Sequence, residues 1–348
     1  MSGHIGFAGL CLLLKSEKTV LRKTSLFLAI FTLLLGAGYG LVVAKFKIFP
    51  YAALNSAWDA VMGDNANMLQ TGPWTIGIYE GTDPLDIRPT EGARNPVLTE
   101  DDVTDIKAAF VADPFLLRED DQYYMFFEIL NQANNQGDIG YAKSTDGLDW
   151  EYGQVILDED FHLSYPNVFK WNDEHYMVPE SHEVSSVRLY KASDFPVAWE
   201  YVGDLLAGYL FVDPTVFYFD DMWWMFSTTP RNDVLNIHFS EQLESGWTPH
   251  TMNPIIRDDA NISRPGGGVI IRNGRPIRFA QDADPEYGIQ VRAFEITDLS
   301  PTSYAEVLIA DDPVLAPSGE GWNAAGMHHV SIIQAPGRHL AAVDGRDR

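Results

Sequence analysis

The chain has 348 residues, of which 46% are hydrophobic and 12% aromatic, and its formal net charge is −25. Residues 1–47 hold six Lys or Arg and one acid, so the rest of the chain carries a net charge of −30. A domain this acidic is repelled by nucleic acid and by anionic lipid, which excludes those partners. The single cysteine is Cys11, so residues 48–348 have no disulfide, no thiolate metal site and no cysteine nucleophile.

Residues 25–44 form a run of twenty residues without a charge. At a helical rise of about 1.5 Å per residue, this run is long enough to cross the hydrocarbon of a bilayer. Four basic residues and one acid precede it, so the positive-inside rule predicts a cytoplasmic segment over residues 1–24 and a transmembrane helix over 25–44. The remainder is then periplasmic or extracellular, beginning with a linker over residues 45–73. A cleaved signal peptide is the alternative, but the run is long and lysines follow it.

A repeated hairpin dominates the rest of the sequence. Residues 109–128 consist of two apolar runs joined by an acidic turn at Asp120-Asp121, which predicts a β-hairpin. The same frame starts again near residues 164, 212, 263 and 328. This period of roughly 50 residues is typical of a four-stranded propeller blade. The pattern predicts an all-β fold, a five-bladed β-propeller over residues 74–348.

The ends of the repeat region indicate how the ring closes. The fifth copy runs out at the C-terminus after about two strands, so we expect an N-terminal strand to complete its blade and remove the exposed sheet edge. Alternation over residues 74–79 predicts this strand, and residues 95–98 predict another. In the first two blades a third strand and a tight turn lead to Trp150 and Trp199, which begin the fourth strands. The many aromatic side chains are expected to pack between blades.

Folding each hairpin about its turn sets one residue of its first strand opposite one of its second. The predicted pairs are Asp113 with Glu128, Tyr165 (after Ser164) with Glu180, Asp213 with Thr228, Arg264 and Pro265 with Gln281 and Asp282, and His329 (after His328) with Asp344. A repeat without a site would show similar small or apolar residues at these positions, whereas most of these are ionisable. Because first strands line a propeller's axis, we expect a pocket there. For a single member such as Asp113-Pro114, a simple turn-forming role is the alternative.

This set of residues suits carbohydrate chemistry. Glycoside hydrolysis needs one carboxylate as base or nucleophile and a second as an acid with a raised pKa. An arginine such as Arg264 can clamp a sugar hydroxyl or an anionic group, and an axial histidine can hold a water, an ion or a sugar oxygen. The run Gly266-Gly267-Gly268 lacks the strand and helix of a nucleotide site, and no HExxH pair is present. The candidate acids are Asp113, Glu128, Glu180 and Asp213.

Several motifs together resemble a known family. They are ADPF at 112, QGDIGYAKS at 136, HLSYPNVF at 162, PES at 179, VDP at 212 and GWNAAGMHH at 321. Over roughly residues 74 to 345 the chain resembles the N-terminal domain of plant glucosamine inositolphosphorylceramide transferases and its bacterial relatives. That domain is in turn similar to the five-bladed propellers of glycoside hydrolase family 43. A separate glycosyltransferase domain follows it in the plant proteins, and this chain ends at Arg348, so transferase activity is not expected of it.

The family 43 pattern implies roles for some of these positions. It matches Asp113 to the general base of the first blade. It has an Asp on the second blade where this chain has Ser164-Tyr165-Pro166, and a Glu acid on the third blade where this chain has Asp213. By its place in the hairpin frame, Glu180 is the expected substitute acid.

The resulting prediction is a membrane-anchored, exported hydrolase-like enzyme acting on a glycan or glycolipid, inverting if it follows family 43. The alternatives are a glycan-binding module beside a separate glycosyltransferase and a purely structural propeller. His328 or His329 resembles a family 43 histidine near a bound ion, so the resemblance allows a structural ion such as calcium, while no cofactor or metal ligand is assigned. The predicted catalytic residues are Asp113, Glu180 and Asp213, and the predicted substrate-binding residues are Glu128, Ser164, Tyr165, Arg264, Gln281, Asp282, His328 and His329.

Overall fold

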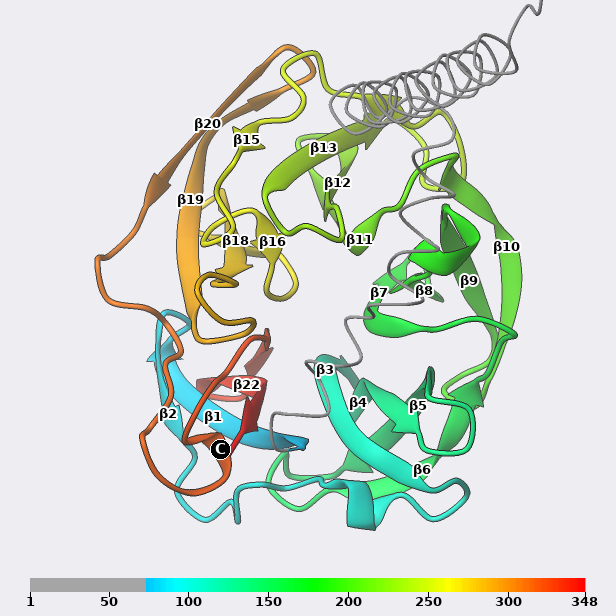
Figure 1. Ribbon diagram of the computed structural model, residues 1–348, viewed down its shortest axis with the longest axis vertical. Helices are drawn as coiled ribbons and strands as arrows, with labels where there is room; N and C mark the ends of the chain where they lie inside the picture. Colours follow the sequence, from blue (N-terminus) through cyan, green and yellow to red (C-terminus); the bar gives the residue numbers. More distant parts are fainter. Residues whose placement is uncertain (1–72, 348) are drawn as a thin grey trace, which may run out of the picture. The chain divides into compact units, whose positions relative to one another are not determined.

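The computed structural model describes residues 73–347. Five antiparallel β-sheets stand around a central axis (Figure 1), and all of them lie in the compact unit Thr71–Arg348. Each sheet follows one copy of the sequence repeat, so the five-bladed propeller predicted from the hairpin pattern is confirmed. The predicted segments 1–24 and 25–44, and nearly all of the linker 45–73, lie outside the described residues and stay predictions. Within residues 73–347, no helix is long and apolar enough to cross a membrane.

The first four blades take the strands in chain order. The first contains β3 (Ala108–Glu119), β4 (Gln122–Asn131), β5 (Gln136–Ser144) and β6 (Glu151–Leu157). The second contains β7 (Ser164–Trp171), β8 (Glu174–Glu180), β9 (Ser186–Asp194) and β10 (Ala198–Ala207). The third contains β11 (Val212–Phe219), β12 (Met222–Thr228), β13 (Val234–Ser240), β14 (Thr248–Pro249) and β15 (Ile256–Arg257). The fourth contains β16 (Arg264–Pro265), β17 (Ile270–Arg272), β18 (Arg275–Gln281), β19 (Val291–Ser300) and β20 (Ser303–Leu308).

The fifth blade joins the two ends of the propeller. Its sheet order is β2 (Asp86–Pro89), β1 (Trp74–Asp83), β22 (Arg338–Arg346) and β21 (Val330–Ala335). The ladder between β1 and β22 is antiparallel and runs from the pair Trp74 and Arg346 to the pair Gly81 and His339. The predicted closure by an N-terminal strand is therefore confirmed.

The strand predicted over residues 95–98 is wrong. Leu98 makes only an isolated bridge to Ile76 of β1. Next to it, the Asn95 side chain accepts the N–H of Ile78 (2.7 Å) and donates to its carbonyl (3.0 Å). The Asn95 side chain thus bonds the backbone of Ile78 in the place where the backbone of a paired strand would. Residues 95–98 therefore run beside β1 without forming a strand.

A bulge shifts the predicted pairing in the first three blades by one residue. Glu128, Glu180 and Thr228 pair with Ala112, Ser164 and Val212, and the predicted partners Asp113, Tyr165 and Asp213 are the next residues along. Each of these three has a positive φ, between 46° and 52°, and precedes a proline. Two first-strand residues therefore face one second-strand residue, which is the definition of a bulge and re-aims the side chain.

In the remaining two hairpins the expected pairing holds. Arg264 pairs with Gln281, although Asp282 falls beyond the end of β18. The fifth ladder starts at Val330 and Val343, which leaves His329 in line with Asp344.

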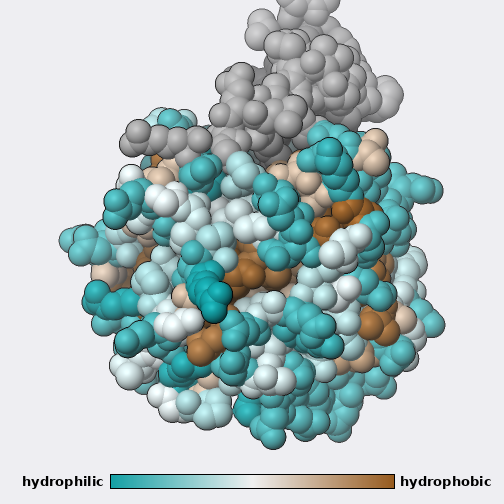
Figure 2. Space-filling view, turned by 90° about the horizontal axis from the view of Figure 1, so that it is seen from below, coloured by the Kyte–Doolittle hydropathy of each residue, from teal (hydrophilic) through white to brown (hydrophobic). Residues whose placement is uncertain are grey.

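Aromatic side chains pack between neighbouring blades, as predicted. The rings of Phe126 and Trp199 lie 5.7 Å apart between the first and second blades, and those of Phe169 and Trp223 lie 5.5 Å apart between the second and third. Trp150 directly precedes β6, which confirms the predicted turn. By contrast, the side of the propeller seen in Figure 2 is mostly hydrophilic, with small separate hydrophobic patches.

Candidate active site at the propeller axis

Five acids meet where the first two strands of the blades approach the axis. Asp113 and Asp213 occupy the bulges of β3 and β11, while Glu128, Glu180 and Asp344 belong to the second strands β4, β8 and β22. All five are buried. Burying carboxylates without partners is costly, so their surroundings decide which of them are ionised.

Asp213 is paired with Arg264 of the next blade. Burial raises the pKa of Asp213 well above its usual range, against the opposing effect of Arg264. The guanidinium Nε lies 2.6 Å from Oδ2 of Asp213, and Nη2 lies 3.2 Å from Oδ1. Gln281 adds a third donor to Oδ2 (3.2 Å), and Nη1 of Arg264 donates to Asn232 (3.0 Å). The ring of Tyr287 covers the guanidinium carbon at 4.9 Å. A guanidinium has about five N–H groups, so Arg264 retains some capacity to bind a substrate oxygen.

Glu180 is held as an ionised carboxylate. Its Oε2 accepts the backbone N–H of Asp213 (2.9 Å), and its Oε1 lies 2.6 Å from Nδ1 of His182 in the short helix η2 (His182–Val184). Burial alone would raise the pKa of Glu180, but His182 and Arg264 outweigh it and hold that pKa below its usual range. Burial likewise opposes the charge on His182, and Glu180 overcomes it, so the pKa of His182 is raised.

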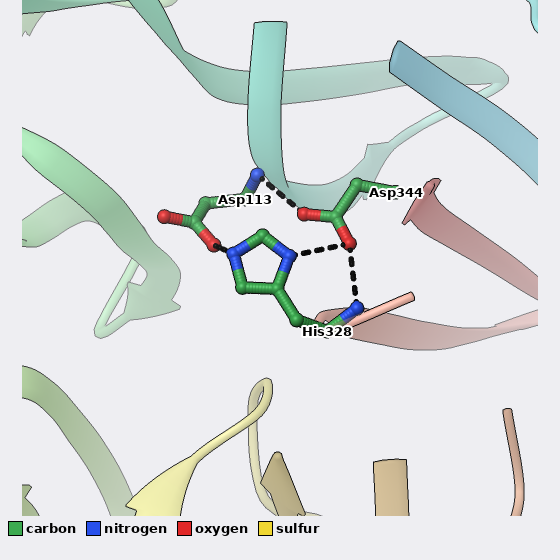
Figure 3. A group of neighbouring side chains, drawn as sticks. All are labelled: Asp113, His328 and Asp344. Carbon is green, nitrogen blue, oxygen red and sulfur yellow. Dashed lines mark hydrogen bonds and ion pairs between the residues drawn. The ribbon is translucent and has the colours of Figure 1, made fainter. Parts of the chain in front are cut away.

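His328 lies between two carboxylates (Figure 3). Its Nδ1 is 2.9 Å from Oδ1 of Asp344, and its Nε2 is 3.4 Å from Oδ1 of Asp113. Oδ2 of Asp344 accepts the backbone N–H of Asp113 (3.1 Å), and the indole of Trp74 lies against the imidazole at 4.0 Å between ring centroids, tilted by 41°. Burial would raise the pKa of Asp344, but His328 lowers it. Burial raises the pKa of Asp113 to about 6, against the opposing effect of His328.

The same three residues offer a calcium ion few free protein ligands. Their ligand atoms lie within 4.8 Å of one another. However, Oδ1 of Asp344 already accepts the backbone N–H groups of His328 and His329 besides facing the imidazole, and Oδ2 accepts that of Asp113. Calcium takes about six to eight oxygen ligands, so an ion at this place would take most of them from water.

Glu128 has little in its surroundings to offset the cost of burying its negative charge. Burial raises its pKa well above the usual range, and the charges of Asp113, Glu180 and Asp213 raise it further. Its Oε1 lies 3.4 Å from Nε2 of His162. Glu128 therefore holds its proton to a higher pH than an ordinary glutamate.

The structure brings most of the other predicted residues to the axis in supporting positions. The hydroxyl of Tyr165 is bonded to Thr215 (2.8 Å) and to the N–H of Gly267 (2.9 Å). Burial lowers the pKa of His329 to about 3, so this ring is neutral, 3.5 Å from Asp113. Ser164 pairs with Glu180 through the backbone.

Asp282 differs from the other predicted residues, because its contacts are with its own loop. Its Oδ2 accepts the side-chain amide of Gln290 (2.9 Å). The residues to which the sequence reasoning gave no role are His162, His182, Tyr287, Trp74 and Asp344, although it had paired Asp344 with His329. A signal existed for two of them, because His162 and His182 stand two residues outside the paired positions 164 and 180.

The fold is that of five-bladed propellers found among glycoside hydrolases and phosphorylases. It is similar to the catalytic domain of the GH62 α-L-arabinofuranosidase of Coprinopsis cinerea, with a TM-score of 0.53 and 14% identity over 79% of this chain and 97% of that one. It is also similar to the β-1,2-mannobiose phosphorylase of Listeria innocua, with a TM-score of 0.55 and 15% identity over 77% of this chain and 96% of that one. At these identities the likeness shows the fold alone.

The sequence places the chain more narrowly. The family model described as glucosamine inositolphosphorylceramide transferase 1, N-terminal, matches residues 67–346. The chain is also 34% identical over 334 residues to the glucosamine inositolphosphorylceramide transferase 1 of Oryza sativa subsp. indica, covering 89% of this chain and 43% of the rice protein. The chain therefore belongs to the family of glucosamine inositolphosphorylceramide transferase N-terminal domains, which confirms the resemblance read from its motifs. It spans less than half of the rice relative.

Proposed function

We propose that this propeller is a glycan-active enzyme of the hydrolase type, with Asp113 as the base and Glu128 as the acid. The electrostatic coupling of these two buried carboxyl groups carries the proposal. Burial raises the pKa of both, to about 6 for Asp113, and the charge of Asp113 raises that of Glu128 further. Once Asp113 is ionised, its charge therefore favours the protonated form of Glu128, which is the division of roles that glycoside hydrolysis needs.

This assignment changes one role predicted from the sequence. The lowered pKa of Glu180 makes it a poor proton donor, and its carboxylate is occupied by the N–H of Asp213 and by His182. The carboxyl group of Asp213 is likewise occupied, by Arg264 and Gln281. We therefore assign Glu180 and Asp213 to positioning, and the acid role to Glu128. Arg264 binds through its remaining N–H groups.

The reaction follows from these positions. Asp113 takes a proton from the water that attacks the anomeric carbon, while Glu128 gives its proton to the glycosidic oxygen as the carbon–oxygen bond breaks. His328 lies between Asp344 and Asp113, with its Nε2 3.4 Å from Oδ1 of Asp113, and so holds the base in place. Attack by water from the face opposite the leaving group inverts the anomeric centre, as in family 43.

The test is turnover of glycans by the full chain. We would incubate it with a panel of polysaccharides and glycolipids, together with Asp113→Asn and Glu128→Gln. Both variants should lower turnover by about 10² to 10⁴ while binding is largely kept. Asp173→Asn, a fully exposed acid in the turn of the second blade, is the matched control and should be unaffected. Turnover unchanged in both site variants would refute the assignment.

A second candidate is a non-catalytic glycan-binding module that works beside a separate glycosyltransferase. One observation favours it: Asp213 stands where the family 43 pattern has its acid, and its carboxyl group is held in an ion pair with Arg264 (2.6 Å). If the chain binds a glycan, cleaves none of the panel, and loses binding in Asp113→Asn and Glu128→Gln, this candidate replaces the first.

The location of the activity is part of the proposal. The charge pattern around residues 25–44 favours an anchored protein with an exported propeller. Protease added to spheroplasts should then digest the propeller and leave residues 1–24 protected. Protection of the propeller would instead place it in the cytoplasm.

A further inference from the structure

His162 is fixed from several sides in the connection between the first and second blades. Its backbone N–H donates to Oε2 of Glu183 (2.9 Å). The next residue, Leu163, donates its N–H to the carbonyl of Gly137 (2.9 Å), and the amide of Gln136 donates to the carbonyl of Phe161 (3.0 Å). Bonds on both sides of His162 thus set the orientation of its ring.

The hydrogen bonds of the ring define its tautomer. The backbone N–H of Gly137 donates to Nδ1 of His162 at 2.9 Å, so Nδ1 carries a lone pair. Burial lowers the pKa of His162, so the ring is neutral and its one proton is on Nε2. Nε2 lies 3.4 Å from Oε1 of Glu128.

Gly137 allows this approach. A Cβ at position 137 would lie 2.2 Å from the carbonyl oxygen of Leu163, 2.8 Å from Cε1 of His162 and 2.9 Å from Oε1 of Glu128. Any side chain would therefore push apart the groups that the backbone of Gly137 brings together.

We propose that His162 is the positioning residue of the acid: its Nε2–H is directed at Oε1 of Glu128, which leaves Oε2 as the oxygen that presents the proton. This inference rests on the proposed function in one respect, the naming of Glu128 as the acid. The arrangement of Nε2 of His162 as donor and Oε1 of Glu128 as acceptor does not depend on that function. The charged groups near Glu128 are Asp113, Asp213 and Arg264. Those near His162 are His182 and Glu183, and Glu180 is near both residues.

The first test reads the tautomer in the full chain labelled with ¹⁵N-histidine. His162→Gln identifies the signal, because that signal disappears in the variant. The nitrogen shifts of His162 should show a neutral ring with the proton on Nε2 at neutral pH, and any titration should lie below the ordinary range of histidine. A proton on Nδ1, or ordinary titration near pH 6.5, would overturn the proposal.

The second test reads Glu128 in the chain labelled with ¹³C at glutamate carboxyls, with Glu128→Gln to assign the signal. An N–H donor favours the ionised carboxylate, so its loss in His162→Ala should raise the pKa of Glu128, by roughly 0.5 to 1 unit for so long a contact. His162→Gln retains an N–H of similar reach and should restore most of the difference. An unchanged pKa of Glu128 in His162→Ala would contradict the role.

Neither measurement needs a substrate, so they separate the two proposals. Absence of glycan cleavage would remove the proposed function, while the tautomer and the titration would still decide the arrangement. If His162→Ala does not fold, the tautomer of the wild-type chain remains the deciding result. With a cleaved substrate in hand, His162→Ala should lower kcat by about 10- to 100-fold with little change in KM.

Discussion

The backbone N–H of Asp213 donates a hydrogen bond to the side chain of Glu180, which belongs to the preceding blade (2.9 Å). The backbone N–H of Asp113 likewise donates to the side chain of Asp344 across the closure of the ring (3.1 Å). In both cases the donor is the bulge residue, whose N–H points away from its own ladder. A second-strand carboxylate thus secures the bulge of the next blade, so these acids support the fold as well as the site.

The bond between Glu180 and Asp213 predicts a stability effect. Glu180→Ala leaves the buried N–H of Asp213 unpaired and should lower the free energy of unfolding by about 1 to 3 kcal/mol. Glu180→Gln, which retains an acceptor, should cost less. Urea denaturation measures both, with Asp173→Asn as a control expected within about 0.5 kcal/mol of wild type. Equal stability of Glu180→Ala and wild type would show that the bond contributes nothing.

The ion pair of Asp213 and Arg264 predicts a strong coupling. Arg264→Met leaves the carboxylate buried without its partner and should cost about 3 to 5 kcal/mol. Replacing both residues, as Asp213→Asn with Arg264→Met, should recover much of that loss because no charge is left unpaired. A double-mutant cycle measured by thermal or urea unfolding gives the coupling. Additive effects would mean that the pair does not interact energetically.

The raised pKa of Asp113 predicts how stability depends on pH. Its pKa is about 6 in the folded chain, against about 3.9 in an unfolded one. The folded state thus holds the proton more tightly, and this contribution is complete below about pH 4 and lost as the pH rises through about 6. Asp113→Asn should therefore be more stable than wild type at pH 7, by about 1 to 3 kcal/mol, with the gain vanishing near pH 4. A variant destabilised equally at both pH values would contradict the buried charge.

The carboxyl groups of Asp113 and Glu128 together predict a bell-shaped pH profile for turnover. The rate should rise as Asp113 ionises near pH 6 and fall when Glu128 loses its proton at higher pH. Measuring kcat/KM against pH on any cleaved glycan tests this. A profile that keeps its acid limb in Asp113→Asn would assign that limb to another group.

Closure by β1 predicts a requirement for the N-terminal strand. A chain that begins at Glu100 lacks β1 and β2, which leaves β22 as an unpaired edge. It should be less soluble and melt at lower temperature than a chain that begins at Lys47. Equal melting temperatures of the two would argue that the ladder of β1 with β22 adds no stability.

The sequence was sufficient for the architecture because each blade repeats one local pattern. Hydrophobic alternation around acidic turns predicted the hairpins, and their number and spacing predicted five blades and a closing strand. The pairing failed by one residue at Asp113, Tyr165 and Asp213 because alternation assumes a regular ladder. The proline after each of them was a usable sign of a bulge, since proline removes a ladder donor.

The site was predictable only where it follows the repeat. Asp113, Glu128 and Glu180 occupy equivalent or neighbouring strand positions, so the hairpin frame located them. His162 and His182 lie in connections between strands, which have no fixed spacing in the repeat. Which acid stays protonated also depends on contacts between blades, such as that of Arg264 with Asp213, and a single hairpin does not contain them.

The ladder between β1 and β22 also sets the order in which the blades can form during synthesis. Thr75 bonds Gly345, 270 positions further along the chain, so a ribosome makes β1 long before β22. Until β22 has been made, β1 can pair only with β2, and four blades can form while the fifth cannot. Such long-range pairing is slow and exposes strand edges to other chains. This propeller is therefore most vulnerable to aggregation before β22 emerges, and removing β22 should be as harmful as removing β1.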